Sequence, residues 1–106
     1  MSELVVAFVT TNTQKEASFL AQKLVEEKFA ACVNIVNNIR SVYEWEGEIH
    51  DEQEHLLIIK STKSKVDKIK GFIEKHHSYE VPEFVCIEVD DALPDYLQWA
   101  RDVTSS

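Results

Sequence analysis

Glycine, proline and cysteine are scarce in this chain, since each occurs only twice among its 106 residues. With Gly47 and Gly71 far apart, there is no glycine-rich loop of the kind that holds phosphate groups. No apolar run approaches the roughly 20 residues that a membrane-spanning helix needs. A nucleophilic serine or cysteine motif is missing as well. These absences argue against a phosphate-binding loop, a membrane span and the common nucleophilic hydrolases.

Basic residues are also few. The 11 lysines and arginines stand against 19 aspartates and glutamates, so the formal net charge is −8. Nucleic acids and anionic membrane surfaces require a basic patch, so we expect neither as a partner. Metal cations and cationic molecules are easier to accommodate. The length and the 44% hydrophobic content suit one globular domain, which we place over residues 1–106.

The two cysteines, Cys32 and Cys86, lie in apolar, strand-like runs. We expect buried, reduced thiols in a cytosolic protein, while the spacing leaves a disulfide or a shared metal ion open as alternatives. The apolar run Leu4–Val9 is too short for the core of a signal peptide. A cytoplasmic location is therefore expected.

The longest extended segment covers residues 31–62 and contains one obvious turn, Glu46-Gly47-Glu48. Before the turn, side chains alternate between two faces, as in a strand, and Tyr43 and Trp45 share one face. After the turn, Leu56–Ile59 suits a buried strand. The resulting hairpin exceeds the usual five or six residues per strand, and so short a chain cannot cover its tip. Because an uncovered strand pair invites aggregation, we expect the hairpin to dock on other copies of this chain.

The flanking segments complete a split βαβ pattern. A buried strand is predicted over residues 4–9 and a helix over 14–28, with Thr13 and Glu16 capping each other's backbone. A second helix with a cap at Ser64, a strand over 84–89 and a short helix from Pro94 follow. The order β-α-β-β-α-β predicts an α+β, ferredoxin-like sandwich with both helices on one face of an antiparallel sheet.

Two local features add detail to this prediction. Asn37-Asn38 interrupts the first hairpin strand and indicates a bulge or bend. Gly71 lies inside the second helix, where it costs about 1 kcal/mol relative to alanine. We therefore expect another group to pack closely against it.

Acidic residues surround the hairpin tip, namely Glu44, Glu46, Glu48, Asp51, Glu52 and Glu54. Carboxylates bind hard cations and serve as acids and bases. However, strand alternation scatters these residues over both faces, and their spacing does not match a calcium loop. A solvated tip that resists aggregation is the favoured interpretation.

The adjacent pair His76-His77 is a sharper feature, because imidazole suits copper, zinc and nickel. Neighbouring residues on a regular helix point about 100° apart, so the two rings would share an ion only at a fraying helix end. Alternatively, both histidines simply favour the negative end of the helix dipole.

Other candidates are weaker. Lys60 at a strand end is a candidate for binding an anion. Arg40 lies near Asn37-Asn38, and this is the only set comparable to the arginine and asparagine with which small ferredoxin-like hydrolases bind phosphate.

Large aromatic residues more often anchor a core or an interface than a ligand. Four of them stand out: Trp45, Tyr79, Tyr96 and Trp99.

Five segments occur in the same order as in CutA, the divalent-cation tolerance family: residues 30–34, 43–47, 60–62, 76–83 and 95–99. The chain resembles this family from about Val5 to Val103. The resemblance implies a ferredoxin-like protomer in a tight homotrimer, with long hairpins that cross between subunits. It further implies a non-enzymatic role in tolerance of copper and other divalent cations, and an architecture similar to the PII signalling proteins.

The resemblance also implies a copper(II) site, in which a cysteine at the end of the first strand joins a histidine pair that corresponds to His76 and His77. This chain has Val9 in place of that cysteine, and so lacks the soft ligand that best holds copper(I). It also has Ser78 where most members have proline, and Glu44 where they have a second aromatic residue. An inter-subunit cleft without an organic cofactor is expected, lined by Trp45, Lys60, His77, Tyr79 and Glu83.

Three other functions remain open at this point. A PII-like sensor would bind a small anionic effector in the same cleft near Lys60. An enzyme would use Arg40 with the neighbouring asparagines. A purely structural trimer would bind nothing specific, and a change of His77 would have no effect.

Overall fold

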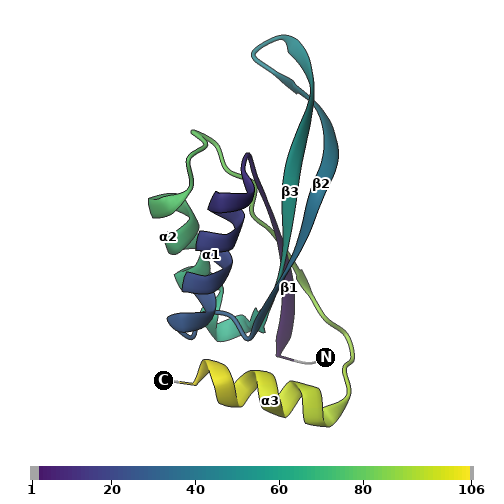
Figure 1. Ribbon diagram of the computed structural model, residues 1–106. Coiled ribbons are helices and arrows are strands. Elements are labelled where there is room, and N and C mark those ends of the chain that lie inside the picture. Colours follow the sequence, from purple (N-terminus) through teal and green to yellow (C-terminus); the bar gives the residue numbers. More distant parts are fainter. Residues whose placement is uncertain (1–2, 106) are drawn as a thin grey trace.

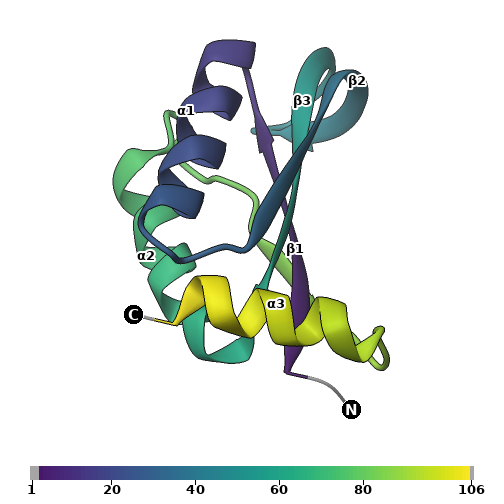
Figure 2. The ribbon, with the colours of Figure 1, turned by 60° about the horizontal axis from the view of Figure 1, so that its bottom comes forward.

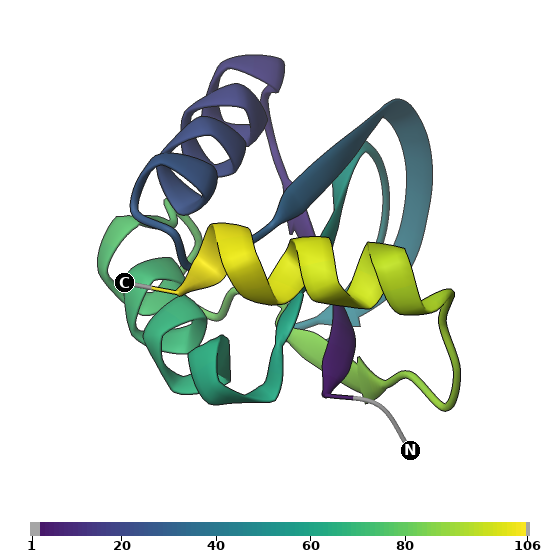
Figure 3. The ribbon, with the colours of Figure 1, turned by 90° about the horizontal axis from the view of Figure 1, so that it is seen from below.

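The computed structural model describes residues 3–105 and has a four-stranded antiparallel sheet at its centre. Its strands, in the spatial order β2-β3-β1-β4, are Cys32–Trp45 (β2), Glu48–Thr62 (β3), Leu4–Thr11 (β1) and Val85–Glu88 (β4). Helices α1 (Gln14–Glu26) and α2 (Val66–His76) cover one face (Figure 1). Helix α3 (Pro94–Thr104) lies across the end of the sheet opposite the hairpin tip (Figures 2 and 3). The predicted ferredoxin-like α+β fold is confirmed.

The β2–β3 hairpin projects far beyond the helices and makes the protomer elongated, with extents of 44 × 25 × 22 Å (Figure 1). Glu46 and Gly47 form its two-residue turn and both have positive φ, 52° and 82°. Such a turn matches the right-handed twist of paired strands. The register between β2 and β3 shifts between Val36 and Ile39, which confirms the bulge predicted at the asparagines.

The main core lies between the sheet and the two covering helices. Strand residues Val9, Leu57 and Ile59 are fully buried there against apolar side chains of α1 and α2. The helix residues of this core include Leu20, Leu24, Ile69 and Ile73. Leu57 and Ile59 alternate with less buried neighbours, so β3 directs one face to the helices and leaves the other open.

The helix starts differ from the predictions in two ways. Thr13 caps α1 as predicted, because its Oγ1 accepts a hydrogen bond from the Glu16 backbone N at 3.1 Å. The Glu16 side chain does not bond back to the Thr13 backbone but binds Ser78. Ser64 is not a helix cap: a 3₁₀ turn over Lys63–Lys65 precedes α2, and Lys65 occupies the cap position.

Two further expectations meet a different outcome. An added Cβ at Gly71 would find no atom within 4 Å, so the expected close contact is absent from the described residues. Both cysteine thiols are free, yet Cys32 is only half-buried, and Cys86 is exposed because it lies on the exposed edge strand β4. Among residues 3–105, no helix has the length and apolar character to cross a membrane.

Candidate functional site

A pocket of about 540 Å³ lies where the hairpin leaves the body of the protein. The hairpin and the end of β1 form part of its wall, and the connector between α2 and β4 forms the rest. Its lining combines aromatic rings, carboxylates and small or apolar groups. The rings are Tyr43, Trp45 and Tyr79, the carboxylates are Glu54, Glu80 and Glu83, and the other groups are Thr10, Ser41, Val42 and Val81.

The structure brings three of the predicted cleft residues together, since Trp45, Tyr79 and Glu83 all line this pocket. Lys60 lies elsewhere: it pairs with Cys32 across β2 and β3, and its Nζ binds the Asn34 side chain. The lining contains no lysine, arginine or histidine. The charge of the pocket is therefore set by carboxylates alone.

Glu54 is the most buried carboxylate of the pocket, with only 6% of its surface exposed. The Tyr79 hydroxyl donates a hydrogen bond to its Oε2 at 2.5 Å. Burial, followed by this bond, raises the pKa of the Tyr79 phenol well above its ordinary value, so the phenol stays protonated. The hydroxyl thus remains a hydrogen-bond donor to the Glu54 side chain.

Glu83 lines the same pocket as Glu54, and its pKa depends on Glu54. Burial raises the pKa of the Glu83 carboxyl, and repulsion by Glu54 raises it further, while a hydrogen bond with Thr10 lowers it. A nearby carboxylate disfavours the charged form of a carboxyl group, as Glu54 does for Glu83. The pair can relieve this repulsion by taking up a proton or by binding a cation.

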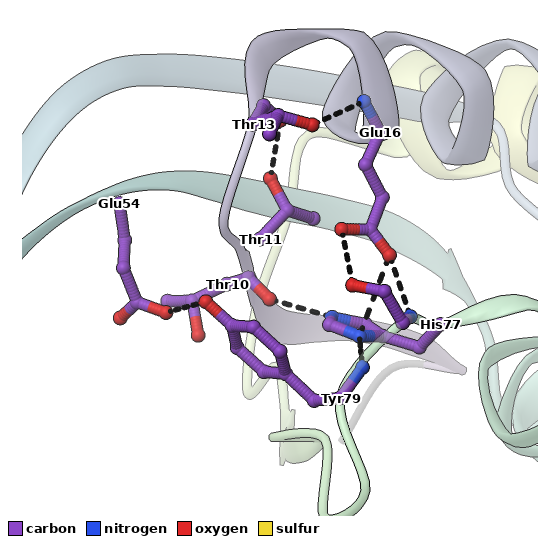
Figure 4. A network of polar contacts seen from close by, with 8 residues as sticks. Thr10, Thr11, Thr13, Glu16, Glu54, His77 and Tyr79 are labelled. Atoms are coloured by element: carbon purple, nitrogen blue, oxygen red, sulfur yellow. Dashed lines mark hydrogen bonds and ion pairs between the residues drawn. The ribbon is translucent and has the colours of Figure 1, made fainter.

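His77 lies beneath this pocket with a fully buried side chain (Figure 4). Its Nε2 is 2.7 Å from the Thr10 carbonyl oxygen, which only accepts, so Nε2 carries the proton and donates. Its Nδ1 accepts a hydrogen bond from the Tyr79 backbone N at 3.1 Å. Both ring nitrogens of this neutral imidazole are therefore used in positioning the connector.

Glu16 fixes the same connector from the side of α1 (Figure 4). Its two carboxylate oxygens accept hydrogen bonds from the Ser78 backbone N at 2.7 Å and the Ser78 hydroxyl at 2.9 Å. Its Oε2 also lies 3.5 Å from Nδ1 of His77. These contacts join α1, the end of β1 and residues 77–79, and so position Tyr79 at the pocket.

His76 has an entirely different environment from His77. Helix α2 ends at His76, and His77 already has an extended backbone, so the two side chains diverge. The His76 ring packs against Phe72 at 4.4 Å and Phe19 at 6.0 Å between centroids, on the outer side of the helices. Within residues 3–105, no group of three or more histidine, cysteine, aspartate or glutamate side chains is placed to hold a metal ion.

Sequence reasoning missed the roles of Glu16 and Glu54. The sequence predicts that Glu54 belongs to a solvated tip, whereas Glu54 is buried and bonded to Tyr79, 25 positions away in the chain. The bulge at the asparagines was the one available signal for the position of Glu54. It shifts the pairing of β2 with β3 directly beside the Ile39–Glu54 pair. Glu16 bonds a residue 62 positions away, and nothing in its local pattern indicated this.

A family model described as "CutA1 divalent ion tolerance protein" matches residues 5–103. "Divalent-cation tolerance protein CutA" of Thermus thermophilus is 39% identical over 99 residues, which are 93% of this chain and 96% of that protein. "Protein CutA" of Homo sapiens is 42% identical over 94% of this chain. The chain spans only 56% of the length of that human relative and of its mouse counterpart.

Solved structures agree with the sequence relatives. CutA1 from Oryza sativa superimposes with a TM-score of 0.94 at 36% identity, covering 98% of this chain and 95% of that one. The Thermus thermophilus divalent cation tolerance protein gives 0.93 at 38% identity, covering 96% and 99%. Family match, sequence identity and fold thus coincide over nearly all of residues 3–105. The chain belongs to the CutA1 divalent ion tolerance protein family.

Proposed function

We propose that this chain is a non-enzymatic, homotrimeric protein of divalent-cation tolerance that binds its cation at the acidic pocket. The carboxyl pair of Glu54 and Glu83 is the observation that carries this proposal. Glu54 disfavours the charged form of Glu83, and a bound divalent cation would offset that repulsion. The printed names of the Thermus thermophilus relatives, which refer to divalent-cation tolerance, support the choice of cation class.

The oxygen donors of the pocket suit a divalent cation, either copper(II) or a harder ion. Glu54 and Glu83 supply carboxylates, and Thr10 supplies a hydroxyl. Among residues 3–105, no three histidine, cysteine, aspartate or glutamate side chains are placed to hold a metal ion together, so the proposed site needs a further ligand from a neighbouring copy. His77 would bind metal only by giving up a hydrogen bond, whereas His76 is exposed and accessible.

The homotrimer is proposed from the hairpin. Its apolar side chains remain open to solvent in the protomer: Val42 is 63% exposed and Ile49 is 71% exposed. At the opposite edge of the sheet, β4 exposes Ile87 by 52%. Exposed apolar strands at both edges favour pairing with further copies, as the resemblance to the family implies.

Two observations favour a binding protein over an enzyme. The Arg40 guanidinium donates two hydrogen bonds to Asp51, at 2.8 and 2.5 Å. It is therefore already paired with a carboxylate and not positioned to bind a phosphate group. Partial desolvation of the Cys86 thiol, followed by the nearby Glu88, raises its pKa, which reduces the share of the nucleophilic thiolate. The two free thiols also suit the reducing cytoplasm, where we place the protein.

A PII-like sensor with a small anionic effector is the alternative. It requires a basic group at the ligand, yet Lys60 is bound to Asn34 outside the pocket. The acidic lining therefore favours a cation over an anion.

A calorimetric titration with copper(II), then manganese(II), at pH 7 tests the proposal. We expect Glu83→Gln to weaken binding about tenfold or more, because it removes a ligand charge. Glu44→Gln, which changes an exposed hairpin carboxylate outside the pocket, should leave binding unchanged. If His76→Ala abolishes binding and Glu83→Gln does not, the cation binds at the histidine and the pocket is wrongly assigned.

A further inference from the structure

A second hollow, of about 420 Å³, lies between α1 and α2 and shares no lining residue with the acidic pocket. We call it the helix groove. Aromatic side chains from both helices and the loop after α1 form much of its surface: Phe19, Phe29, Phe72 and His76. Phe19 is 45% exposed, although apolar side chains of this size normally lie inside. The volume falls within the range of roughly 300–1,000 Å³ typical of small-molecule sites.

Gly71 lines this groove. Glycine inside a helix costs about 1 kcal/mol relative to alanine. The fold gives no reason for this cost, because the backbone there has no positive φ and a Cβ would meet nothing within 4 Å. The space that a side chain would fill belongs to the groove. A ligand that occupies the groove would explain the glycine.

The aromatic rings form a connected surface. Phe72 contacts Phe29 edge to face, with centroids 6.4 Å apart, and lies 4.4 Å from His76. Phe19 approaches His76 edge to face at 6.0 Å. Rings arranged in this way present both edges and faces, which suits a further planar ring.

The charge at the groove runs against that of the whole chain. Lys23 and Lys75 line it together with one carboxylate, Glu27, whereas the chain as a whole carries a formal charge of −8. Lys68 adds a further ammonium group 5.8 Å from the centre of the Phe29 ring. Lys23 also has Glu26 at 3.5 Å, in an exposed pair that is worth little. The local excess of positive charge selects an anion.

We propose that the helix groove binds a small aromatic carboxylate. Its ring lies against Phe19 and Phe72, and its anionic group lies beside the ammonium groups of Lys23 and Lys75. The site is independent of the acidic pocket and of the cation proposed there, because the two share no residue.

Calorimetric titration with 1-naphthoate provides the test, with circular dichroism to confirm that each variant folds. We expect one saturable site per protomer in the wild type. Gly71→Leu fills the groove with a good helix former, and Lys75→Glu reverses a charge at the groove, so each should weaken binding about tenfold or more. Lys70→Glu is the matched control, because Lys70 is exposed on the same helix but does not line the groove.

The cationic analogue 1-naphthylmethylamine should bind at least about tenfold more weakly than 1-naphthoate. Equal binding of the two compounds would overturn the charge selection, and therefore the proposed ligand class. The site itself is refuted by a wild type that shows no saturable binding, or by a Lys75→Glu variant that binds as tightly as Lys70→Glu. The comparison of Lys75→Glu with Lys70→Glu tests the proposed site even if Gly71→Leu does not fold.

Discussion

His76 and His77 are neighbours in the chain, yet one faces solvent and the other has no accessible side-chain surface. The buried ring of His77 connects the end of β1 to the connector that carries Tyr79. The exposed ring of His76 contributes to the aromatic surface of the helix groove. One histidine therefore positions the acidic pocket, and the other belongs to a different surface.

Replacing each histidine with alanine should separate these roles. His77→Ala removes two hydrogen bonds and leaves a cavity, so we expect a loss of about 2 kcal/mol or more in the free energy of unfolding. His76→Ala is the adjacent control and should cost less than about 1 kcal/mol. Guanidinium unfolding at a fixed protomer concentration measures both. Equal losses would show that His77 does not hold the connector.

Glu83 should make stability depend on pH. Folding raises its pKa, so its neutral form stabilises the fold below the ordinary glutamate pKa of about 4.3. This contribution is lost as the pH rises through the folded-state pKa, and the charged carboxylate then opposes folding. We therefore expect Glu83→Gln to raise the unfolding midpoint at pH 7 and to have little effect below about pH 4.

Thermal unfolding of both proteins between pH 3 and 8, without divalent cations, follows this difference. A glutamine variant that is less stable than the wild type at pH 7 would contradict the repulsion between Glu83 and Glu54.

At the scale of elements, both residues of the hairpin turn have positive φ, a conformation that strains the backbone of Glu46 but that glycine adopts freely at Gly47. Gly47→Ala should lower the free energy of unfolding by about 1 kcal/mol, because a Cβ disfavours the left-handed conformation. Glu46→Asn should raise it by a few tenths of a kcal/mol, since Asn-Gly is the preferred pair in this turn. Chemical denaturation tests both changes. A harmless Gly47→Ala would mean that the turn adopts another conformation.

The elements themselves were largely predictable, because their signals are local. Alternation around Tyr43 and Trp45, the bulge at the asparagines and the cap at Thr13 each depend on residues within a few positions of one another. The acidic pocket was only partly predictable. Trp45, Tyr79 and Glu83 were expected at the cleft through the family resemblance, and the structure brings them together.

The missing part of the site depends on contacts between distant segments. The local pattern predicts Glu16 as part of a capping box, whereas in the structure Ser78, from the connector after α2, donates two hydrogen bonds to it. A carboxylate accepts these well-aligned bonds in preference to one at its own helix start. Gly71 shows the same limit, since local reasoning predicted a packing partner inside the protomer and the structure shows open space.

At the scale of the whole molecule, the outer part of the long hairpin is not covered by other elements of the protomer (Figure 1). The helices cover one face of the sheet, and α3 covers only one end (Figures 1 and 3). Apolar side chains at the tip and on β4 remain open to solvent in the protomer. Pairing with further copies would cover them and would bring a neighbour close to the acidic pocket, which lies where the hairpin leaves the body.

Sedimentation equilibrium at micromolar concentration, without added metal, is the most direct measurement of this assembly. The proposed homotrimer predicts a single species of about 37 kDa, three times the protomer mass of 12.2 kDa. The mass should not change on dilution, because an interface formed by such hairpins belongs to the obligate class of about 2,000 Å² or more. A species of 12.2 kDa would contradict the assembly, and with it the cation site that a neighbouring copy completes.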